Sequence, residues 1–549
     1  MRCKRRCLFL LALCGCCALA AEGQPAAART LAIRKDGSGQ FTSIQAFADA
    51  AKPGDVGVVQ EGVYAERVAV KQSGTPKRPI VFKAQGKVVM QGFDVAKQDH
   101  IVIDGFEITP GQPKQDGIAI VSSRGSRILN NHIHHTTGDN RAQGCGIMES
   151  DTRDLQIERN HIHHTAGAGI RLSRPAPSER TLVKGNTISF PGFGNGSTTA
   201  IAMGKGTHLL VEENDLSHVG DFVISWGGDF HVIRNNVFRD VLESDWDNGP
   251  HVDGVQGCSS HILIEGNRMY NVHEKGLNVH FALFEADTKQ GVFPSNVTLR
   301  YNVVNGIDSC FLAVQGGYKQ ARAYHNTVVR TNGSARAHKN SAAVAIWHGG
   351  SGVVLNNLFC HASGSARNLY LTDKTLTPET WFDYNLAYHG ATEGGWNPEY
   401  PVPEGTDRHG VRDKDPLFAA YSDDGDAMND DLALQDASPA REAGGPLTTL
   451  AADAGKEVAL KVADAGFFQA GWAGVQPDWI AVGEAENAAQ LAAIDYATQT
   501  LTLAAPLPKE AKAGAPVWLF KKSDGARVLY GARPDIGAFE WGSPPPAKP

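Results

Sequence analysis

The sequence is poor in cysteine once its first twenty residues are set aside. Five of the nine cysteines lie in that leader, and Cys145, Cys258, Cys310 and Cys360 remain, with no Cys-x-x-Cys pair among them. Zinc ribbons need closely paired cysteines, so this spacing argues against a zinc ribbon. Isolated buried thiols and a single disulfide both stay open.

The chain also has no excess of positive charge. It carries 52 lysine and arginine residues against 59 aspartate and glutamate residues, a formal net charge of −7. Proteins that bind nucleic acid carry a basic footprint, so we expect no nucleic-acid partner. An anionic glycan stays open as a ligand, because local basic residues rather than the net charge decide such binding.

The N-terminal apolar run is too short to span a bilayer. The basic residues MRCKRRC precede LFLLALCGCCALA, which ends in Ala18-Leu19-Ala20. This order predicts a secretory signal peptide over residues 1–20, no transmembrane segment, and a periplasmic or secreted protein. A lipoprotein box ending at Cys16, with a lipid anchor there, is the alternative.

The long central region shows no sustained helical period, but it repeats. An asparagine followed by one residue and then an apolar residue recurs at a mean spacing of about 28 residues, in the range of solenoid proteins. We call the ten recurring residues the marker asparagines: Asn131, Asn160, Asn186, Asn214, Asn236, Asn267, Asn302, Asn326, Asn357 and Asn385.

The segments between the markers read as short strands. HLLVEEN and NVTLRYN are rich in β-forming residues and are bounded by glycine, asparagine or serine. Two or three such strands in about 28 residues make one coil of a parallel β-helix. We therefore predict about ten or more coils over residues 30–445, with the marker asparagines stacked as an amide ladder at a turn.

The two ends of the solenoid differ from its middle. Ile44 to Ala51 is an amphipathic stretch and predicts a helical cap at the N-terminal end. Residues 446–529 leave the repeat, and AIDYATQTLTLAAPLP with APVWLFKK predicts a small antiparallel β-module there. Residues 530–549 hold PDIGAFEW, which predicts a return strand, and a proline-rich tail.

Alternation along one strand of each coil separates inward from outward side chains. The residues predicted to point inward are Ile118, Ile147, Ile170, Ile201, Val223, Leu277 and Leu312. The residues predicted to point outward are Arg171, Ser173, Trp226, Asp253, Asn278, His280, Gln315 and Trp347. Because coils stack about 4.8 Å apart, we expect the outward residues to form one stripe that lines a groove.

Several residues of this stripe, together with Lys205, are candidates for binding a substrate. Arg171 and Lys205 suit substrate carboxylates, with simple solubility as the alternative. Trp226 and Trp347 suit stacking on sugars, although aromatic side chains also pack under loops. The other outward polar residues predicted to contact substrate are Asn278 and Gln315.

Both ends of the chain resemble known secreted proteins. GDVGVVQEGVYAERVAV and SGTPKRPIVFKAQGKVVMQG resemble the N-terminal coils of β-helix polysaccharide lyases of the alginate lyase and chondroitinase B kind. IDYATQTLTLAAPLP and PDIGAFEW are similar to the closing module of bacterial right-handed β-helix carbohydrate-active proteins. The resemblance implies a right-handed solenoid and an enzyme that acts on a polysaccharide. The central coils lack the lysine-and-arginine catalytic block of the chondroitinase B group and the DPHD signature of uronate epimerases.

The most polar stretch of the solenoid is ESDWDNGPHVDGVQG. Glu243, Asp245 and Asp247, with Asp253 close behind, offer the oxygen ligands that calcium prefers, so the loop is a candidate Ca²⁺ site. A solvated acidic turn is the alternative. Histidine side chains ordinarily titrate near neutral pH, so His251 in the same loop is a candidate acid.

The next coil contributes NVHEKGLNVHF. Lys275 and the outward His280 suit proton abstraction from an acidic sugar, together with His251 from the preceding coil. A surface ion pair between Lys275 and Glu274 is the alternative for the lysine. Earlier in the chain, NHIHHT occurs twice and brings six histidines into register, which predicts a stacked histidine ladder in preference to a metal site.

Three classes of function remain open. The leading one is a monomeric polysaccharide lyase that cleaves a uronic-acid glycan by β-elimination, with Lys275, His280 and His251 as its acid–base groups. The second is a glycoside hydrolase, which needs two carboxylates such as Asp253 with Asp245 or Asp247. The third is a non-catalytic glycan-binding protein.

Overall fold

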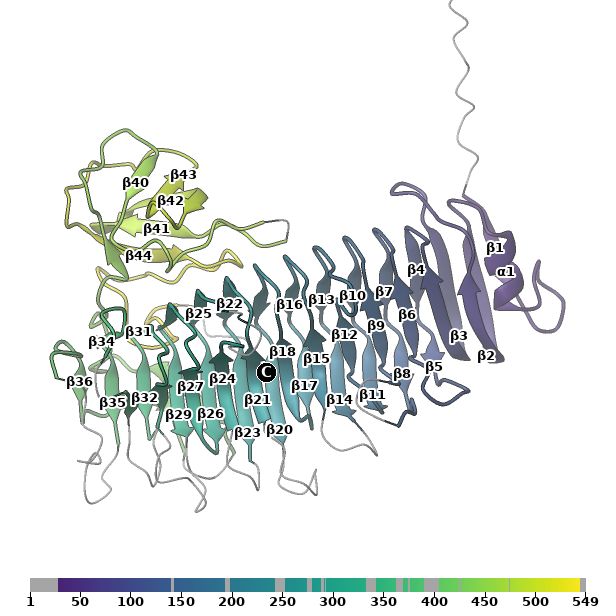
Figure 1. Cartoon of the computed structure of the whole chain (residues 1–549), viewed down its shortest axis with the longest axis horizontal. Coiled ribbons are helices and arrows are strands. Elements are labelled where there is room, and N and C mark those ends of the chain that lie inside the picture. Colours follow the sequence, from purple (N-terminus) through teal and green to yellow (C-terminus); the bar gives the residue numbers. More distant parts are fainter. Residues whose placement is uncertain are drawn as a thin grey trace, which may run out of the picture.

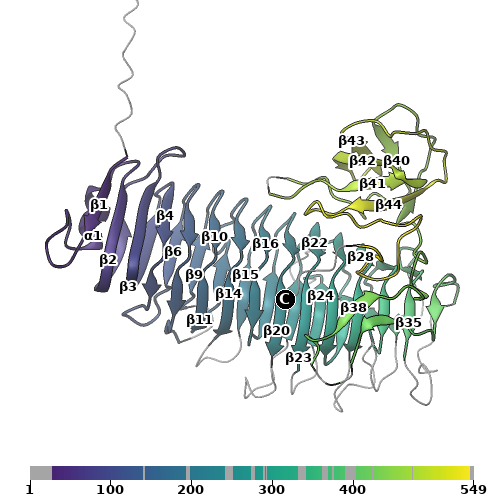
Figure 2. The same cartoon turned by 180° about the vertical axis from the view of Figure 1, so that it is seen from behind.

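A parallel solenoid makes up most of the molecule, and a small second unit lies beside its C-terminal half (Figures 1 and 2). The computed structural model describes residues 28–543 apart from 140–142, 193–197, 242–251, 274–278, 288–290, 292, 332–341, 362–368, 374–375, 390–403, 423, 425 and 473. The solenoid makes about 12 turns, which confirms the predicted β-helix. No helix in these residues is long and apolar enough to cross a membrane.

Each coil contributes one strand to each of three parallel sheets. Sheet 1 holds β4 (Ile101–Asp104), β7 (Arg127–Leu129), β10 (Gln156–Glu158), β13 (Leu182–Lys184), β16 (Leu210–Glu212), β19 (Val232–Arg234), β22 (Ile262–Glu265), β25 (Val297–Arg300), β28 (Ala321–Tyr324), β31 (Gly352–Leu355) and β34 (Trp381–Asp383). Sheet 2 holds β5 (Glu107–Ile108), β8 (His132–His134), β11 (His161–Thr165), β14 (Thr187–Pro191), β17 (Asp215–Ser217), β20 (Val237–Val241), β23 (Arg268–Val272), β26 (Val303–Ile307), β29 (Thr327–Thr331), β32 (Leu358–Cys360), β35 (Leu386–Tyr388) and β36 (Val411–Arg412). Sheet 3 holds β6 (Ile118–Val121), β9 (Ile147–Ser150), β12 (Ile170–Leu172), β15 (Thr199–Met203), β18 (Asp221–Ser225), β21 (Val252–Gly257), β24 (Val279–Glu285), β27 (Cys310–Gln315), β30 (Val344–Ile346) and β33 (Tyr370–Thr372).

The N-terminal end is closed by longer strands and one short helix. Strands β1 (Thr30–Ile33), β2 (Val56–Val70) and β3 (Ile80–Ala96) precede the regular coils, and α1 (Ile44–Ala50) confirms the predicted cap. The Ser43 hydroxyl accepts the Ala46 amide at 3.1 Å and so caps the helix. Phe47 of α1 packs edge-on against Phe82 with ring centroids 5.1 Å apart, which joins the helix to the solenoid core.

The marker asparagines lie at the corner between sheets 1 and 2 and form the predicted ladder. Each one is at most 1% exposed. Its backbone N–H and its side-chain amide both donate to Oδ1 of the next marker, at 2.8–3.1 Å throughout. The residue before each marker has positive φ, as at Asn130, Arg159 and Tyr301. A left-handed conformation costs about 1 kcal/mol or more for a residue other than glycine, so the ladder offsets a strained corner.

The C-terminal module is antiparallel, as predicted. A hairpin of β37 (Phe418–Ala420) and β38 (Asp431–Leu434) precedes it, and its sheet holds β39 (Thr448–Thr449), β40 (Ala459–Lys461), β41 (Trp479–Val482), β42 (Glu484–Asp495), β43 (Thr500–Leu503) and β44 (Pro516–Lys521). Buried ion pairs hold the module to sheet 1. Arg300, which is fully buried, lies 2.7 Å from Asp478 of the module and 2.5 Å from Glu265 of the neighbouring coil.

The predicted return strand at PDIGAFEW is instead an irregular segment. Its backbone amides are satisfied outside any sheet: Gly537 N donates to the Asn356 carbonyl at 2.8 Å, and Ala538 N donates to the Thr327 hydroxyl at 2.9 Å. The segment therefore closes over the ladder side of the solenoid without extending a sheet. The four cysteines of the described chain are free and buried.

We expect Asn131→Ala to lower the free energy of unfolding by about 2–4 kcal/mol, because it leaves the buried Phe106 amide without its acceptor and breaks the ladder. The matched control is Asn130→Gly in the same coil. It removes an exposed amide from a left-handed position that glycine adopts freely, so we expect less than about 1 kcal/mol of change. Urea denaturation measures both, and equal losses would contradict a special role for the ladder.

Two buried histidines predict acid sensitivity. Ser225 Oγ and the Gly206 carbonyl engage the two ring nitrogens of His231, and burial lowers its pKa from 6.5 to about 4. Burial also lowers the pKa of His325 to about 3. Each neutral ring stabilises the fold fully above pH 6.5, and this contribution is lost as the pH falls toward the folded pKa.

Below pH 6.5, each of these histidines should therefore cost about 1.4 kcal/mol of stability per pH unit. Urea titrations between pH 7 and pH 5 should show a smaller pH slope for His231→Gln than for the unaltered chain. The exposed-site variant His135→Asn should keep the original slope. If the slope of His231→Gln is unchanged, His231 does not contribute to the acid response.

Candidate functional site

The inward half of the predicted alternation is confirmed for the described residues of sheet 3. Ile118, Ile147, Ile170, Ile201, Val223 and Leu312 are all 0% exposed and belong to one core. Leu277 lies outside the described residues. The outward half of the prediction is wrong for Ser173 and Asp253, which are 1% and 0% exposed. The predicted single stripe also separates into three columns of residues in register.

The first column holds the candidate acid–base groups. Asp253 of β21 is in register with His280 of β24, which is in register with Cys310 of β27. The second column contains Arg171, which pairs with Ala202 one coil on. The third lies at the far end of the strands, where Gln315 is in register with Glu285. The columns separate because the alternation of buried and exposed residues breaks within the strands of sheet 3. In β24, for example, the successive residues Phe281 and Ala282 are both buried.

The centre of the first column is a hydrogen-bonded pair. His280 Nδ1 lies 2.8 Å from Asp253 Oδ1. The Asp253 side chain is fully buried, whereas the His280 side chain keeps 13% of its surface exposed. A buried carboxylate that holds Nδ1 fixes the ring orientation and stabilises an imidazolium, so proton exchange falls to Nε2. This arrangement suits a general base or acid at the surface of the solenoid.

A second histidine–carboxylate pair lies at the same corner. His273 follows β23, Asp308 follows β26, and His273 Nδ1 is 3.0 Å from Asp308 Oδ1. Asp308 precedes Cys310, the register partner of His280, by two residues. The corner between sheets 2 and 3 therefore carries two such pairs on successive coils.

Asp221 and Cys310 complete the first column. The Asp253 backbone amide donates to Asp221 Oδ1 at 3.2 Å, which places these carboxylates on neighbouring coils. The Cys310 thiol donates to the Leu312 carbonyl, and burial raises the pKa of Cys310 to about 12. The thiol is thus protonated at neutral pH and is unsuited to act as a nucleophile.

Sequence reasoning missed Asp221, Asp308 and Cys310. Asp221 occupies the place of Asp253 one coil earlier, directly before FVIS, so an alignment of the coils would have found it. Asp308 follows NVVNGI just as His273 follows its own strand. Neither residue belongs to a recognisable motif, so only an alignment of successive coils would have found them.

The other predicted substrate contacts lie apart from His280. Arg171 lies four coils before His280, about 19 Å at 4.8 Å per coil, with Asp116 and Cys145 as its electrostatic neighbours. Lys205 is exposed in the turn after β15, and Trp226 follows β18. Trp347 Nε1 donates to Gln315 Oε1 at 3.0 Å, and Gln315 lies 3.5 Å from the Glu285 carboxylate. This polar and aromatic row lies at the opposite end of the sheet 3 strands from the first column and suits contact with a sugar ring there.

Six predicted site residues lie outside the described residues, and their roles stay predictions. They are the acid–base candidates Lys275 and His251, the substrate contact Asn278, and the calcium ligands Glu243, Asp245 and Asp247. Their described chain neighbours, Val252 and Val279, pair in register at the start of β21 and β24.

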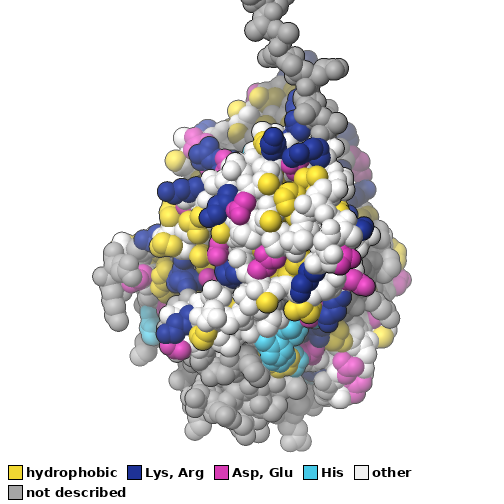
Figure 3. Space-filling view, turned by 90° about the vertical axis from the view of Figure 1, so that its right-hand side faces the viewer, with side chains coloured by type: hydrophobic (Ala, Val, Ile, Leu, Met, Phe, Trp, Pro, Cys, Tyr) yellow, Lys and Arg dark blue, Asp and Glu magenta, His cyan; other side chains and the backbone are white. Residues whose placement is uncertain are grey.

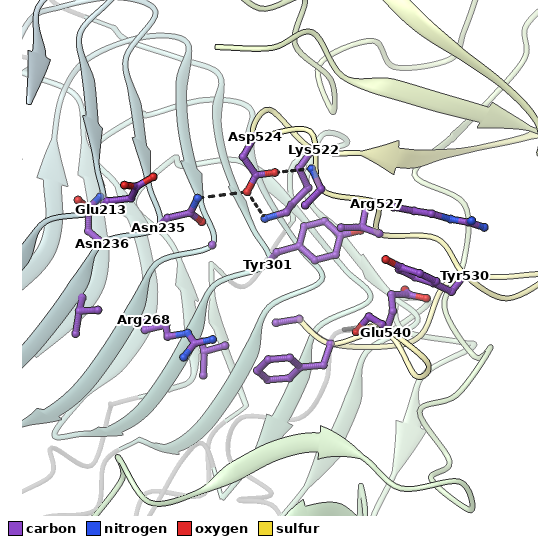
Figure 4. Close-up of a pocket in the computed structure, with 18 residues that line it drawn as sticks. Glu213, Asn235, Asn236, Arg268, Tyr301, Lys522, Asp524, Arg527, Tyr530 and Glu540 are labelled. Carbon is purple, nitrogen blue, oxygen red and sulfur yellow. Dashed lines mark hydrogen bonds and ion pairs between the residues drawn. The ribbon is translucent and has the colours of Figure 1, made fainter. Parts of the chain in front are cut away.

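A cavity of about 680 Å³ lies elsewhere, between the module and the solenoid (Figure 4). Tyr301, Lys522 and Asp524 line it, and none of the predicted site residues does. Its polar groups engage one another: Lys522 lies 3.0 Å from Asp524, and Arg527 lies over the Tyr530 ring at 4.8 Å. Burial acts to raise the pKa of Asp524, but Lys522 and the Ala526 amide outweigh it and lower the pKa to about 2. We therefore place the candidate site on the His280 face.

Comparison with known proteins bears on the fold. Residues 87–216 match the family described as right handed beta helix region, which agrees with the right-handed solenoid that the resemblance implied. No curated protein matches the sequence.

Several solved structures are similar at low identity. Alginate lyase from Paenibacillus sp. str. FPU-7 is 20% identical over 48% of this chain and 92% of its own, with a TM-score of 0.38. GH136 lacto-N-biosidase from Eubacterium ramulus is 13% identical over 65% of this chain and 67% of its own, with a TM-score of 0.42. The PL6 family alginate lyase AlyGC is 15% identical over 69% of this chain and 53% of its own, with a TM-score of 0.43.

The burial of the thiols gives a direct test of the site's packing. Burial raises the pKa of Cys145 and Cys310 to about 12 and that of Cys258 to about 11. In the chain without its first twenty residues, we expect a disulfide reagent such as DTNB at pH 8 to label no thiol of the folded protein. The same reagent should label all four thiols after unfolding in guanidinium. Rapid labelling of the folded chain that disappears in Cys310→Ala would show that the first column is open to solvent.

Proposed function

We propose that the chain is an enzyme that cleaves a uronic-acid polysaccharide by β-elimination at the first column of sheet 3. The observation that carries the proposal is the His280–Asp253 pair, in which a fully buried carboxylate holds a partly exposed imidazole at 2.8 Å. The resemblance of the N-terminal coils to secreted β-helix lyases points to the same chemistry. The row of Glu285, Gln315 and Trp347, at the far end of the same strands, offers contacts for a more distant sugar of the chain.

The chemistry assigns one role to each member of the pair. His280 Nε2 removes the proton at C5, the C5–H electrons form the C4–C5 double bond, and the C4–O glycosidic bond breaks. The departing oxygen takes up a proton. A neutral imidazole suits this step because the proton lies beside the substrate carboxylate, and a carboxylate base would be repelled by that anion. Asp253 is a positioning residue that stabilises the imidazolium that forms.

Two further roles fall to residues outside the described part of the chain. Elimination needs a cation against the substrate carboxylate, and Lys275, five residues before His280, suits this role. His251, two residues before Asp253, suits proton donation to the departing oxygen. Calcium held by Glu243, Asp245 and Asp247 remains part of the proposal, since a divalent cation beside Asp253 would also offset the charge of an acidic sugar.

Glycoside hydrolysis is the second candidate, and one observation favours it. Asp221 and Asp253 lie on neighbouring coils, as their 3.2 Å backbone-to-carboxylate contact requires. A hydrolase places two carboxyl groups on either side of the scissile bond, and both must reach the sugar. Asp253 is 0% exposed and is engaged by His280, so it suits orientation better than contact with a glycosidic oxygen. We therefore rank elimination first.

An assay on a panel of uronate polysaccharides separates the two reactions. Incubation with alginate, polygalacturonate, chondroitin sulfate and hyaluronan should release oligosaccharides from at least one of them, with the ultraviolet absorbance of the conjugated C4–C5 double bond. New reducing ends without that absorbance would favour hydrolysis. If neither signal arises on any of these glycans while labelled glycan still binds, the protein is a glycan-binding solenoid.

On the polysaccharide that is cleaved, His280→Gln should lower kcat/KM by about a hundredfold or more, the usual scale for loss of a general base. Asp253→Asn should lower kcat, because it keeps the shape of the side chain but loses the charge that stabilises an imidazolium. His261→Gln is a matched control: His261 Nδ1 lies 2.8 Å from Asp229 Oδ1, a similar pair at another corner, and this change should leave kcat/KM within about twofold.

His273→Gln tests the neighbouring pair. If His273→Gln abolishes turnover while His280→Gln does not, the base belongs to the His273–Asp308 pair. Near-normal turnover in both variants would exclude the first column as the catalytic site. Thermal denaturation of every variant shows whether a loss of turnover comes from unfolding.

A further inference from the structure

The repeated NHIHHT segments form a histidine ladder on β8 and β11, far from the first column. His132 is in register with His161, and His134 with His163. The paired rings stack at 4.9 Å and 5.1 Å with interplanar angles of 7° and 4°, as the repeat predicts. A group of histidine side chains is visible on the lower flank of the solenoid when it is viewed from its N-terminal end (Figure 3).

Stacking alone does not explain the positions of the ring nitrogens. His132 and His163 belong to different stacks, yet their Nε2 atoms lie 2.8 Å apart across the diagonal. One nitrogen from each of His132, His161 and His163 falls within 4.8 Å of the other two. His161 is exposed, and its ring makes no hydrogen bond to any residue in the described part of the chain. Three imidazoles thus converge on one point at the surface.

We propose that His132, His161 and His163 bind one first-row transition-metal dication, such as zinc. Zinc takes imidazole nitrogen at 2.0–2.1 Å in a tetrahedral arrangement, which places ligand nitrogens about 3.3 Å apart. The present spacing of 2.8 to 4.8 Å brackets that value, so small side-chain rotations would suffice. Three imidazoles without a carboxylate favour zinc, copper or nickel over calcium, which takes oxygen ligands.

The surrounding histidines suit such a site. His163 Nδ1 lies 2.8 Å from His164 Nδ1, so a His163 that binds metal through Nε2 keeps its proton on Nδ1 and donates it to His164. Contacts of this kind orient metal-binding histidines.

The metal would join two successive coils. His132 belongs to β8, and His161 and His163 belong to β11, in the N-terminal third of the solenoid. Binding to the folded chain alone raises its stability in proportion to the logarithm of metal concentration. Metal at this site would stabilise the fold and take no part in the elimination proposed above, so the two proposals are tested independently.

The test is equilibrium dialysis of the full chain against ZnCl₂ at pH 7.5, with bound zinc measured by mass spectrometry of the metal. The unaltered chain should bind one more zinc per chain than His161→Gln or His163→Gln, each of which should weaken this site at least tenfold. His135→Asn is the matched control. His135 is exposed on the same coil and stacks on His164 at 5.2 Å, but it lies outside the triad, so its variant should bind like the unaltered chain.

Cobalt gives an independent readout, because Co²⁺ bound by nitrogen ligands in a tetrahedral site has visible absorption bands that free Co²⁺ lacks. These bands should appear with the unaltered chain and be lost in His161→Gln. Melting curves without metal should show that this exposed variant is folded. The proposal is overturned if the unaltered chain and His161→Gln bind equal zinc, or if His135→Asn loses as much as His161→Gln, since the histidines would then act as unspecific surface ligands.

Discussion

The structure depends on a single repeated interaction, the bond from each buried asparagine amide to the oxygen of the next. Because both the backbone and the side-chain donors of one marker reach the same Oδ1 atom, the ladder fixes the spacing and the lateral register of successive coils. A coil can then lengthen between markers without disturbing its neighbours. The steps from Asn214 to Asn236 and from Asn267 to Asn302 differ in length, yet their ladder bonds are 2.9 Å and 3.1 Å. Residues placed at equal distances from the corner therefore meet across coils, and this is how His280 meets Asp253 although 27 residues separate them.

Much of this architecture was open to prediction from the sequence, since the markers and the inward aliphatic column are local patterns. The roles of Asn131 and Ile147 can be predicted because a residue of the same kind recurs about one coil away along the chain. The outward face was only partly predictable, because alternation was assumed to continue unbroken through sheet 3. The alternation breaks in β18 at Phe222–Val223 and in β24 at Phe281–Ala282, because both residues of each pair are buried. That break shifts Asp253 and His280 out of line with Trp226 and Gln315, so one expected stripe became three columns.

No local sequence pattern predicts where the C-terminal module packs on the solenoid. Arg300 and Asp478 are 178 residues apart, and Arg234 reaches the Ser523 carbonyl across 289 residues. Nothing in the composition around Arg300 marks it as fully buried, since a basic residue in a strand is ordinarily a surface residue. A charge pair inside the protein is costly to break, because removing one partner leaves the other desolvated. The module is thus fixed to sheet 1 by polar specificity as well as by the apolar cluster around Tyr324 and Leu355.

The last rung of the ladder has a different chemistry. Beyond Asn385 the acceptor is the carboxylate of Asp407, which takes the Asn385 amide at 3.2 Å and is held by Arg412. An asparagine at this position would present a side-chain amide donor at the end of the ladder. An unpaired donor at an open end of a solenoid can pair with the end of another molecule. An ionised carboxylate accepts hydrogen bonds but has no hydrogen to donate to a further residue. Asp407 therefore closes the ladder, because its side chain offers no amide donor for a further rung.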